Sequence, residues 1–362
     1  MQIRRVIMKN VRNFVDFDHT FEDPWSGCIP ESLLLIGPNG SGKTTLLSAI
    51  ANLWQVLGFY LRDYEQLTIG EVAVVLDLLE SSDFAGIEII GLEDDPIWIF
   101  MGQERIYDEF AFTQVNCHRI GASFDIALAL KGGKSVSYWY AAPGATTMEK
   151  TEGLSDWQQR WAQRLMENVL GKRADLPNVV YLESESRVLL PVKEGFSVQP
   201  EPEEFRWLAR YEPTTGRKGS LHNYLYNLKV VDEAIFQEII EQANAFLVGK
   251  RLDGFDRRTG DLMVQVEDGG SHSINDLSSG EKQVLLMIAT ITHWLRPGGI
   301  VLIDEPDLHL HPSLTTAFVG HLRRMVADKN GQMIIASHAP ELWQDFTSSH
   351  RVELGSLDEV RR

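Results

Sequence analysis

The sequence predicts an α/β fold with a parallel sheet at its centre, and three short apolar runs carry this prediction. They are Ser32–Ile36, Gly299–Asp304 and Met333–His338, and polar residues end or follow each of them. Runs that are apolar at nearly every position are typical of strands buried on both faces, in the middle of a parallel sheet. Because open sheets of this kind bind ligands at the carboxyl ends of their strands, we expect a site there.

The segment after the first run predicts a phosphate-binding loop. Its residues are Gly37, Pro38, Asn39, Gly40, Ser41, Gly42, Lys43, Thr44 and Thr45, and an apolar helical stretch follows. Glycines let backbone N–H groups turn inward around an anion, and the N-terminus of the helix adds its dipole. Lys43 can reach the β- and γ-phosphates of a nucleotide, and the Thr44 hydroxyl can ligate Mg²⁺. The strand before the loop and the helix after it argue against an ordinary glycine turn.

The other two runs end in side chains that suit hydrolysis of a phosphate. Asp304 can hold the Mg²⁺ shell, and Glu305 can orient or deprotonate the attacking water. His338, at the end of the third run, can hydrogen-bond a γ-phosphate or the water beside it. Taken singly, the two acids could be a strand-end cap and His338 an ordinary surface histidine, so their order along the chain carries the interpretation.

A second anion site is predicted where Leu277–Gln283 leads into the apolar helix Val284–Leu295. A serine and a glycine that open a helix present free N–H groups to an anion, and here these are Ser278 and Gly280. The alternative for Ser278 is a helix N-cap and nothing more.

In this order the four segments resemble the motifs of the ABC-type ATPases. Residues 37–45 match their Walker A, 277–283 their LSGGQ-like signature, 300–305 their Walker B and His338 their switch histidine. The signature departs from many members at one position, Ser279, where they have glycine. The segment Glu305–Pro312 resembles that of the overcoming-lysogenisation-defect (OLD) family and its relatives in bacterial defence systems. Residues 3–14 resemble the opening of that branch and of RecF-like repair ATPases.

The resemblance covers roughly residues 1–55 and 260–350, and it implies a fold and a mechanism. The fold would be an ABC-type P-loop core with an antiparallel β portion and an inserted helical and β region. Residues 1–60 and 255–362 would form the core, and 61–254 the rest. The cofactors would be ATP and Mg²⁺, with Thr44 and Asp304 on the metal and Lys43, Glu305 and His338 in catalysis. Ser278 and Gly280 would complete the site of a second subunit in a homodimer. A glutamine of the Mg²⁺-contacting loop would be Gln103 or Gln114.

The middle of the chain predicts further elements by pattern. Alternation and the turn Lys131–Lys134 predict a hairpin of Phe124–Leu130 and Ser135–Tyr140, and a second hairpin is predicted around Leu262–Val266. Helical spacing predicts amphipathic helices over 155–170 and Val231–Val248. We expect a core strand at Val179–Leu182 and a loop over 191–220. His309 and His311, two residues apart, suggest packing and dimer contact more than a metal site.

Composition limits the function. The net charge of −17 argues against a generic DNA-coating role, although Arg4, Arg5, Lys9 and Arg12, or Arg206, Arg210, Arg217 and Lys218, could form local basic patches. Two cysteines without metal spacing indicate a reducing cytosol. We expect no apolar run to reach membrane-spanning length or to form a signal peptide, so a cytoplasmic protein is expected.

Two function classes follow. The first is a sensor or regulator ATPase of a bacterial defence system, a nucleotide-driven dimer switch that controls a separate effector such as a nuclease. The second is a RecF-like repair ATPase that binds DNA directly. No sustained heptads separate the Walker A segment from the signature, which argues against the chromosome-maintenance group. About 25 residues follow His338, too few for a nuclease domain, so we expect a partner to supply any nuclease activity. A transporter ATPase and a non-hydrolysing binding module are weaker alternatives.

Overall fold

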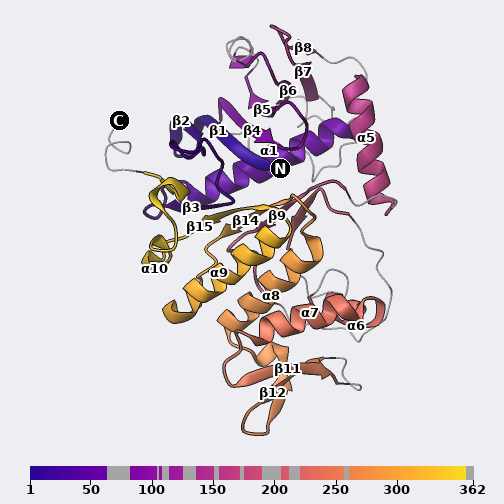
Figure 1. Cartoon of the computed structure of the whole chain (residues 1–362), viewed down its shortest axis with the longest axis vertical. Coiled ribbons are helices and arrows are strands. Elements are labelled where there is room, and N and C mark those ends of the chain that lie inside the picture. The colour runs from indigo at the N-terminus through magenta and orange to yellow at the C-terminus, as the bar shows by residue number, and fades with distance from the viewer. Residues whose placement is uncertain are drawn as a thin grey trace.

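Two large sheets with a helix between them form the centre of the molecule (Figure 1). The structure, a computed structural model, describes residues 1–62, 82–103, 106–107, 114–124, 136–150, 155–171, 175–189, 205–211, 221–256 and 261–355. We call the seven-stranded sheet A, the six-stranded sheet B and a small three-stranded sheet C.

Sheet B is parallel and contains the three apolar runs as neighbouring strands. Its order is β10 (Leu208–Arg210), β9 (Val179–Leu182), β14 (Ile300–Asp304), β15 (Gln332–Ala336), β3 (Ser32–Ile36) and β16 (Arg351–Glu353). Every residue of β3, β14 and β15 is buried, which confirms the prediction of central strands. Asp304 pairs with Ala336 and Ala336 with Leu35, so these three strands end at the same edge.

Sheet A is the predicted antiparallel portion. Its order is β2 (Phe14–Thr20), β1 (Gln2–Val11), β4 (Phe84–Ile90), β5 (Ile97–Gly102), β6 (His118–Phe124), β7 (Val136–Ala141) and β8 (Glu149–Lys150). All neighbours run antiparallel except β5 and β6, which are parallel. The predicted hairpin is confirmed in its second strand. The predicted first strand, Phe124–Leu130, lies outside the described residues except for Phe124, the last residue of β6.

Helix α1 (Lys43–Leu61) packs between sheets A and B and joins their cores. Two tryptophans fix it to sheet B: the rings of Trp54 and Trp207 stack at 4.1 Å, and each indole N–H donates to the other residue's carbonyl. Within the described residues α1 is also the one helix long and apolar enough to cross a membrane, against our expectation of none. Since 78% of that stretch is buried in the fold, it has the burial of a core helix.

The opposite face of sheet B is covered by α8 (Ser279–Trp294) and α9 (Pro312–Asp328). Behind α8 lie α6 (Leu221–Val231) and α7 (Glu233–Asn244), followed by sheet C with β11 (Lys250–Phe255), β12 (Leu262–Val266) and β13 (Ser271–Ser273). Short helices α10 (Pro340–Trp343), η2 (Ile274–Asp276) and η3 (Ser348–His350) complete the described chain. Apolar residues of α6, α7, α8 and α9 form a second core with sheet B.

Four predicted elements of the middle of the chain can be compared with the described residues. Helix α5 (Asp156–Val169) and the hairpin of β12 and β13 are confirmed, with Ser155 accepting a hydrogen bond from the Gln158 N–H as the N-cap of α5. The predicted helix over 231–248 is confirmed as α7, which is shorter at both ends. It begins at Glu233, where the Asp232 side chain caps it by accepting from the Ile235 N–H, and it ends at Asn244. Of the loop predicted over 191–220 the structure describes only residues 205–211, and there it is wrong at β10, a three-residue strand too short to show an alternating pattern. The rest of that prediction lies outside the described residues.

Candidate nucleotide-binding site

The loop between β3 and α1 has the backbone that a phosphate cradle requires. Gly42 has φ 98°, and a Cβ there would lie 2.6 Å from the ring of Phe14. At Gly37 a Cβ would lie 2.4 Å from the carbonyl oxygen of Leu354. Only glycine fits at both positions, since the left-handed conformation at Gly42 and the close approach at Gly37 exclude a side chain. Neighbouring segments at 14 and 354 therefore hold the loop in place.

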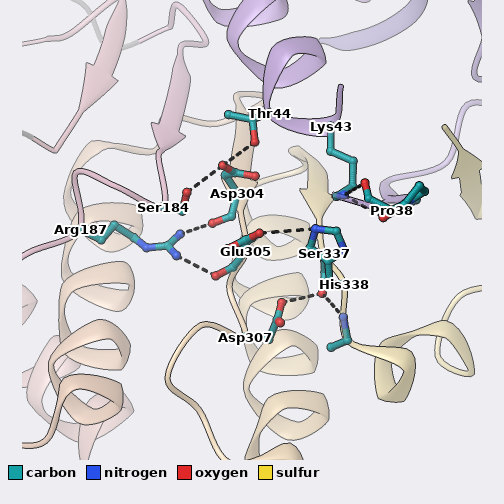
Figure 2. A network of polar contacts seen from close by, with 12 residues as sticks. Pro38, Lys43, Thr44, Ser184, Arg187, Asp304, Glu305, Asp307, Ser337 and His338 are labelled. Carbon is teal, nitrogen blue, oxygen red and sulfur yellow. Dashed lines mark hydrogen bonds and ion pairs between the residues drawn. The ribbon is translucent and has the colours of Figure 1, made fainter. Parts of the chain in front are cut away.

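Lys43 begins α1 and turns its ammonium group back over the loop. Its Nζ donates to the carbonyl oxygens of Gly37 and Pro38, at 2.9 and 3.1 Å (Figure 2). Burial lowers the pKa of Lys43, whereas Glu305 and Asp304 act to raise it. A lysine held in this way can reach phosphate oxygens that enter the loop.

Asp304 lies at the end of β14 and accepts two hydroxyl hydrogen bonds on one oxygen. Thr44 Oγ1 and Ser184 Oγ both donate to its Oδ2 at 2.9 Å. The residue is only 2% exposed, and its Oδ1 is buried with no hydrogen-bond partner. Buried polar atoms are seldom left unpaired, so this oxygen points to a missing ligand.

The residues around Asp304 fit Mg²⁺. This ion keeps several waters and binds proteins through one or two oxygen ligands plus substrate phosphates, so a free carboxylate oxygen beside a threonine hydroxyl suits it. Among the described residues no group of three or more His, Cys, Asp or Glu side chains could hold a metal ion. Such a cage is not required for an ion that shares its ligands with a nucleotide.

Glu305 adopts a strained backbone and faces a histidine. Its φ is 48°, uncommon for a residue with a side chain, and its N–H donates to the Ala336 carbonyl at 2.7 Å. The carboxylate Oε1 lies 3.6 Å from Nε2 of His338 (Figure 2). Strain of this kind collects at functional sites and costs on the order of 1–3 kcal/mol. The geometry brings the acid and the imidazole to the edge of the sheet where Lys43 and Thr44 lie.

The segment after Glu305 is tied to the end of β15. Ser337 Oγ donates to Asp307 Oδ1 at 2.5 Å and accepts from the Ala339 N–H at 2.9 Å. His311 is the N-cap of α9, where its side chain accepts from the Ser313 N–H. Both His309 and His311 are exposed, so the structure does not support packing for this pair, and dimer contact stays a prediction.

The sequence predicted no role for Ser184 or Arg187. Both follow β9, and Arg187 donates to the carbonyl oxygens of Asp304 and Glu305 at 2.6 and 2.7 Å. Their position after the carboxyl end of a core strand was the signal that could have found them.

The signature segment does not join the P-loop within this chain. Ser278 is the N-cap of α8 in a full capping box with Glu281, whose carboxylate also accepts from Lys250. Gly280 lies against the segment after β14, where a Cβ would be 2.5 Å from the His309 carbonyl oxygen. No hydrogen bond or ion pair of the described chain links Ser278 or Gly280 to residues 37–45.

Of the two candidate glutamines, Gln103 lies in a network that approaches the P-loop. Its amide and that of Asn10 both donate to the Asp83 carboxylate, at 2.6 Å each. Asn13, in the turn after Asn10, donates to the Gly40 carbonyl. Gln114 makes a different contact: its backbone carbonyl accepts a hydrogen bond from the Cys117 thiol. The role of Gln103 in contacting Mg²⁺ stays a prediction.

Comparisons with known proteins match parts of this chain. Residues 192–343 match the family described as "AAA domain, putative AbiEii toxin, Type IV TA system". Three relatives are similar over shorter stretches: protein ea59 of Escherichia phage lambda (38% identity over 73 residues), the retron Ec83 probable ATPase of Escherichia coli (30% over 164) and the retron Vc95 probable ATPase of Vibrio cholerae serotype O1 biovar El Tor (34% over 107). The matches cover 20%, 40% and 26% of this chain, but only 14%, 30% and 20% of those proteins.

A solved structure shares the whole fold. It is the SMC head bound to the C-winged helix domain of ScpA, with a TM-score of 0.51 and 14% identity over 99% of this chain and 95% of that one. The fold and the site thus define the class: the chain is a P-loop protein with the ABC-type ATPase fold. Within that class it is similar to the retron ATPases of bacteria and to the AbiEii-type AAA family.

Proposed function

We propose that this protein binds MgATP at the edge of sheet B and hydrolyses it. The observation that carries the proposal is the meeting of the P-loop with the end of β14, through the 2.9 Å hydrogen bond from Thr44 to Asp304. The pair of Glu305 and His338, at 3.6 Å, lies on the same network. An acid and an imidazole beside a phosphate cradle suit attack by water on a terminal phosphate.

Each residue has a distinct part in this proposal. Lys43 and the N–H groups of residues 37–42 bind the phosphates, and Thr44 and Asp304 hold the metal ion. The bound Mg²⁺ supplies positive charge that offsets the charge developing on the phosphate oxygens. Glu305 orients a water and accepts its proton, and His338 donates a hydrogen bond toward the γ-phosphate. In-line attack then releases ADP and phosphate.

The second half of the site would come from another copy of the chain. In support, Ser278 and Gly280 open α8, and in the described part of the chain no hydrogen bond or ion pair joins them to their own P-loop. A helix N-terminus binds anions well, so Ser278 of one subunit would face the γ-phosphate bound to the other. The output of such a homodimer is its geometry, closed with ATP and open after hydrolysis.

At the level of the cell we propose a regulator in a prokaryotic defence system, acting in the cytoplasm on a separate effector. The similarity to two retron ATPases and to the AbiEii-type family supports this. Among the described residues no group of three or more His, Cys, Asp or Glu side chains could hold a metal ion, so we assign any cleavage of nucleic acid to a partner protein such as a nuclease.

The test is ADP release by the purified full chain with Mg²⁺, beside a Glu305→Gln variant, together with the molecular mass in ATP. The proposal is supported if the Glu305→Gln variant releases no ADP and if its molecular mass in ATP is that of a dimer. Wild-type protein that binds ATP but does not hydrolyse it would reduce the function to a nucleotide-binding module. A monomer under all nucleotide conditions would contradict the shared site.

A further inference from the structure

Arg187 lies next to the site and hydrogen-bonds the backbone of Asp304 and of Glu305, the carboxylate that we propose accepts the proton of water. Its side chain is buried, at 2% exposed, just beyond the carboxyl end of β9. Nη1 donates to the Asp304 carbonyl at 2.6 Å, and Nη2 to the Glu305 carbonyl at 2.7 Å (Figure 2). Two parallel bonds from one planar guanidinium therefore fix two consecutive carbonyls.

The charged side chain of Arg187 donates its hydrogen bonds to uncharged carbonyl and amide groups. Burial lowers its pKa to about 10, while Asp304, Asp307 and Glu305 act to raise it, so the guanidinium is protonated at neutral pH. None of its hydrogen bonds goes to a carboxylate oxygen; its acceptors are three backbone carbonyls and the amide oxygen of Gln283. The carboxylates of Asp304 and Glu305 are thereby left available to the site.

The two hydrogen bonds from Arg187 hold Glu305, the residue with the strained backbone. Glu305 has φ 48°, and the turn it makes directs its carboxylate to within 3.6 Å of His338. A backbone in this region persists only when its surroundings hold it. The two hydrogen bonds from Arg187 lock the peptides on both sides of the Glu305 Cα, because the carbonyls of 304 and 305 flank that atom.

Arg187 is also bonded to the signature helix. Its Nε donates to Gln283 Oε1 at 2.8 Å, and Gln283 Nε2 returns a bond to the Arg187 carbonyl at 2.6 Å. Gln283 is 6% exposed and follows Ser278 by little more than one turn of α8. The first turn of α8 touches the same region a second time, where Gly280 lies against the His309 carbonyl.

We infer that Arg187 is a positioning residue: it fixes the direction in which the Glu305 carboxylate points, and it couples Glu305 to the signature helix α8 through Gln283. The inference rests on the proposed hydrolysis in a shared site and deepens it. When Ser278 engages the nucleotide of the partner, a shift of α8 passes through Gln283 and Arg187 to the Glu305 peptide. Each subunit then hydrolyses its own ATP only when its signature helix is engaged.

The experiment measures turnover, ATP affinity and melting temperature for Arg187→Lys, Arg187→Met, Gln283→Met and the double Met variant. Arg119→Lys is the matched control, because Arg119 is also fully buried and donates to a carbonyl, that of Ala145, on sheet A. We expect Arg187→Lys to lower turnover about 10-fold and Arg187→Met about 100-fold, since small misplacements of a catalytic group cost this much. The dissociation constant for ATP should stay within about 3-fold, because binding depends on the P-loop.

The double Met variant tests whether Arg187 and Gln283 act as one unit. Residues that act as one unit show non-additive effects, so the double Met variant should turn over within about 3-fold of Arg187→Met alone. Gln283→Met alone should lower the Hill coefficient for ATP toward one. If Arg187→Met fails to fold, Arg187→Lys and Gln283→Met decide the same question.

The outcomes separate the two proposals. Normal turnover in the Arg187 variants, or effects that multiply in the double variant, overturns this inference alone. Affinity lost in step with turnover, or an equal loss in Arg119→Lys, assigns Arg187 to general stability and overturns it as well. Wild-type protein without Mg²⁺-dependent hydrolysis overturns the proposed function and this inference with it.

Discussion

Thr44 and Asp304, 260 positions apart in the sequence, are joined by a 2.9 Å hydrogen bond from the threonine hydroxyl to the carboxylate. Thr44 lies in the first turn of α1, and Asp304 ends β14, with β15 between β14 and β3 in the sheet. The contact therefore crosses the end of β15, and it joins the P-loop and the end of β14 in a single site. The predictions below test the parts of that site and its surroundings.

Lys43→Ala should weaken ATP binding about 10- to 100-fold, because hydrogen bonds from a charged donor to phosphate contribute about 1.5–3 kcal/mol each. Isothermal titration with ATP and Mg²⁺ measures the change. Lys329→Ala, at an exposed lysine after α9, is the control and should bind normally. Unchanged affinity in Lys43→Ala would remove residues 37–45 from nucleotide binding.

Glu305→Gln should keep ATP binding and lower turnover about 10²- to 10⁴-fold, because an amide cannot accept the proton of water. Phosphate release and equilibrium ATP binding measure the two effects. Asp304→Ala should instead weaken the Mg²⁺-dependent part of binding. Ser184→Ala is the milder control, since Asp304 Oδ2 retains its bond from Thr44. Equal turnover of wild type and Glu305→Gln would exclude Glu305 as the catalytic base.

Ser278→Asp should abolish hydrolysis while single-subunit ATP binding stays nearly intact. Aspartate caps a helix as well as serine does, so α8 should keep its start, but the new charge would repel the phosphate of the partner's nucleotide. Ser155→Asp makes the same change at the N-cap of α5 and should hydrolyse ATP normally. Mixing Ser278→Asp with Lys43→Ala tests how many sites a dimer needs: partial rescue means that one suffices. Full activity of Ser278→Asp alone would contradict a shared site.

The capping box of α8 should contribute stability that depends on pH. Burial acts to raise the pKa of Glu281, but the hydrogen bonds from Lys250 and Ser278 outweigh it, and the pKa lies below the ordinary 4.5. A carboxyl with a lowered folded pKa stabilises the protein above its unfolded pKa and loses this contribution as the pH falls through the folded value. Glu281→Gln keeps the box without the charge. We expect it to melt about 1–3 °C lower at pH 7 and the gap to close below pH 4.5. A gap that is constant with pH would exclude the charge as its source.

The isolated protein should bind duplex DNA weakly at physiological salt and should work on a protein partner. Phosphate contacts dominate DNA affinity and need clustered basic side chains, whereas the net charge here is −17. Three arginines of the candidate patches are already paired with acids: Arg4 with Glu88, Arg5 with Asp18 and Arg210 with Glu183. Fluorescence anisotropy over a salt series measures DNA binding, and co-purification with products of adjacent genes tests for a partner. Tight, salt-resistant binding with ATPase stimulation by DNA alone would favour the RecF-like alternative.

The motifs were readable from the sequence because each depends on local chemistry. The loop at 37–45 needs glycines at fixed offsets before a helix, and the three buried strands need unbroken apolar runs. These features predicted β3, β14 and β15, the start of α1 and the acids at 304 and 305. Where local signals were weak, the prediction missed an element or its exact bounds: β10 has three residues, and the start of α7 at Glu233 depends on one capping side chain, Asp232.

The sequence by itself determined the class of fold and the residue types at the site, because strand burial and phosphate binding leave short, dense patterns. Only the tertiary structure decided which distant groups meet. Ser184 and Arg187 follow a core strand, but nothing in their own segment shows which groups they bond. Their partners Asp304, Glu305 and Gln283 come from other strands and helices. The turn at Glu305, strained at φ 48°, is likewise fixed by Arg187 from outside its own segment. Hydrogen bonds between segments depend on how the chain folds back on itself, and no pattern within one segment records that.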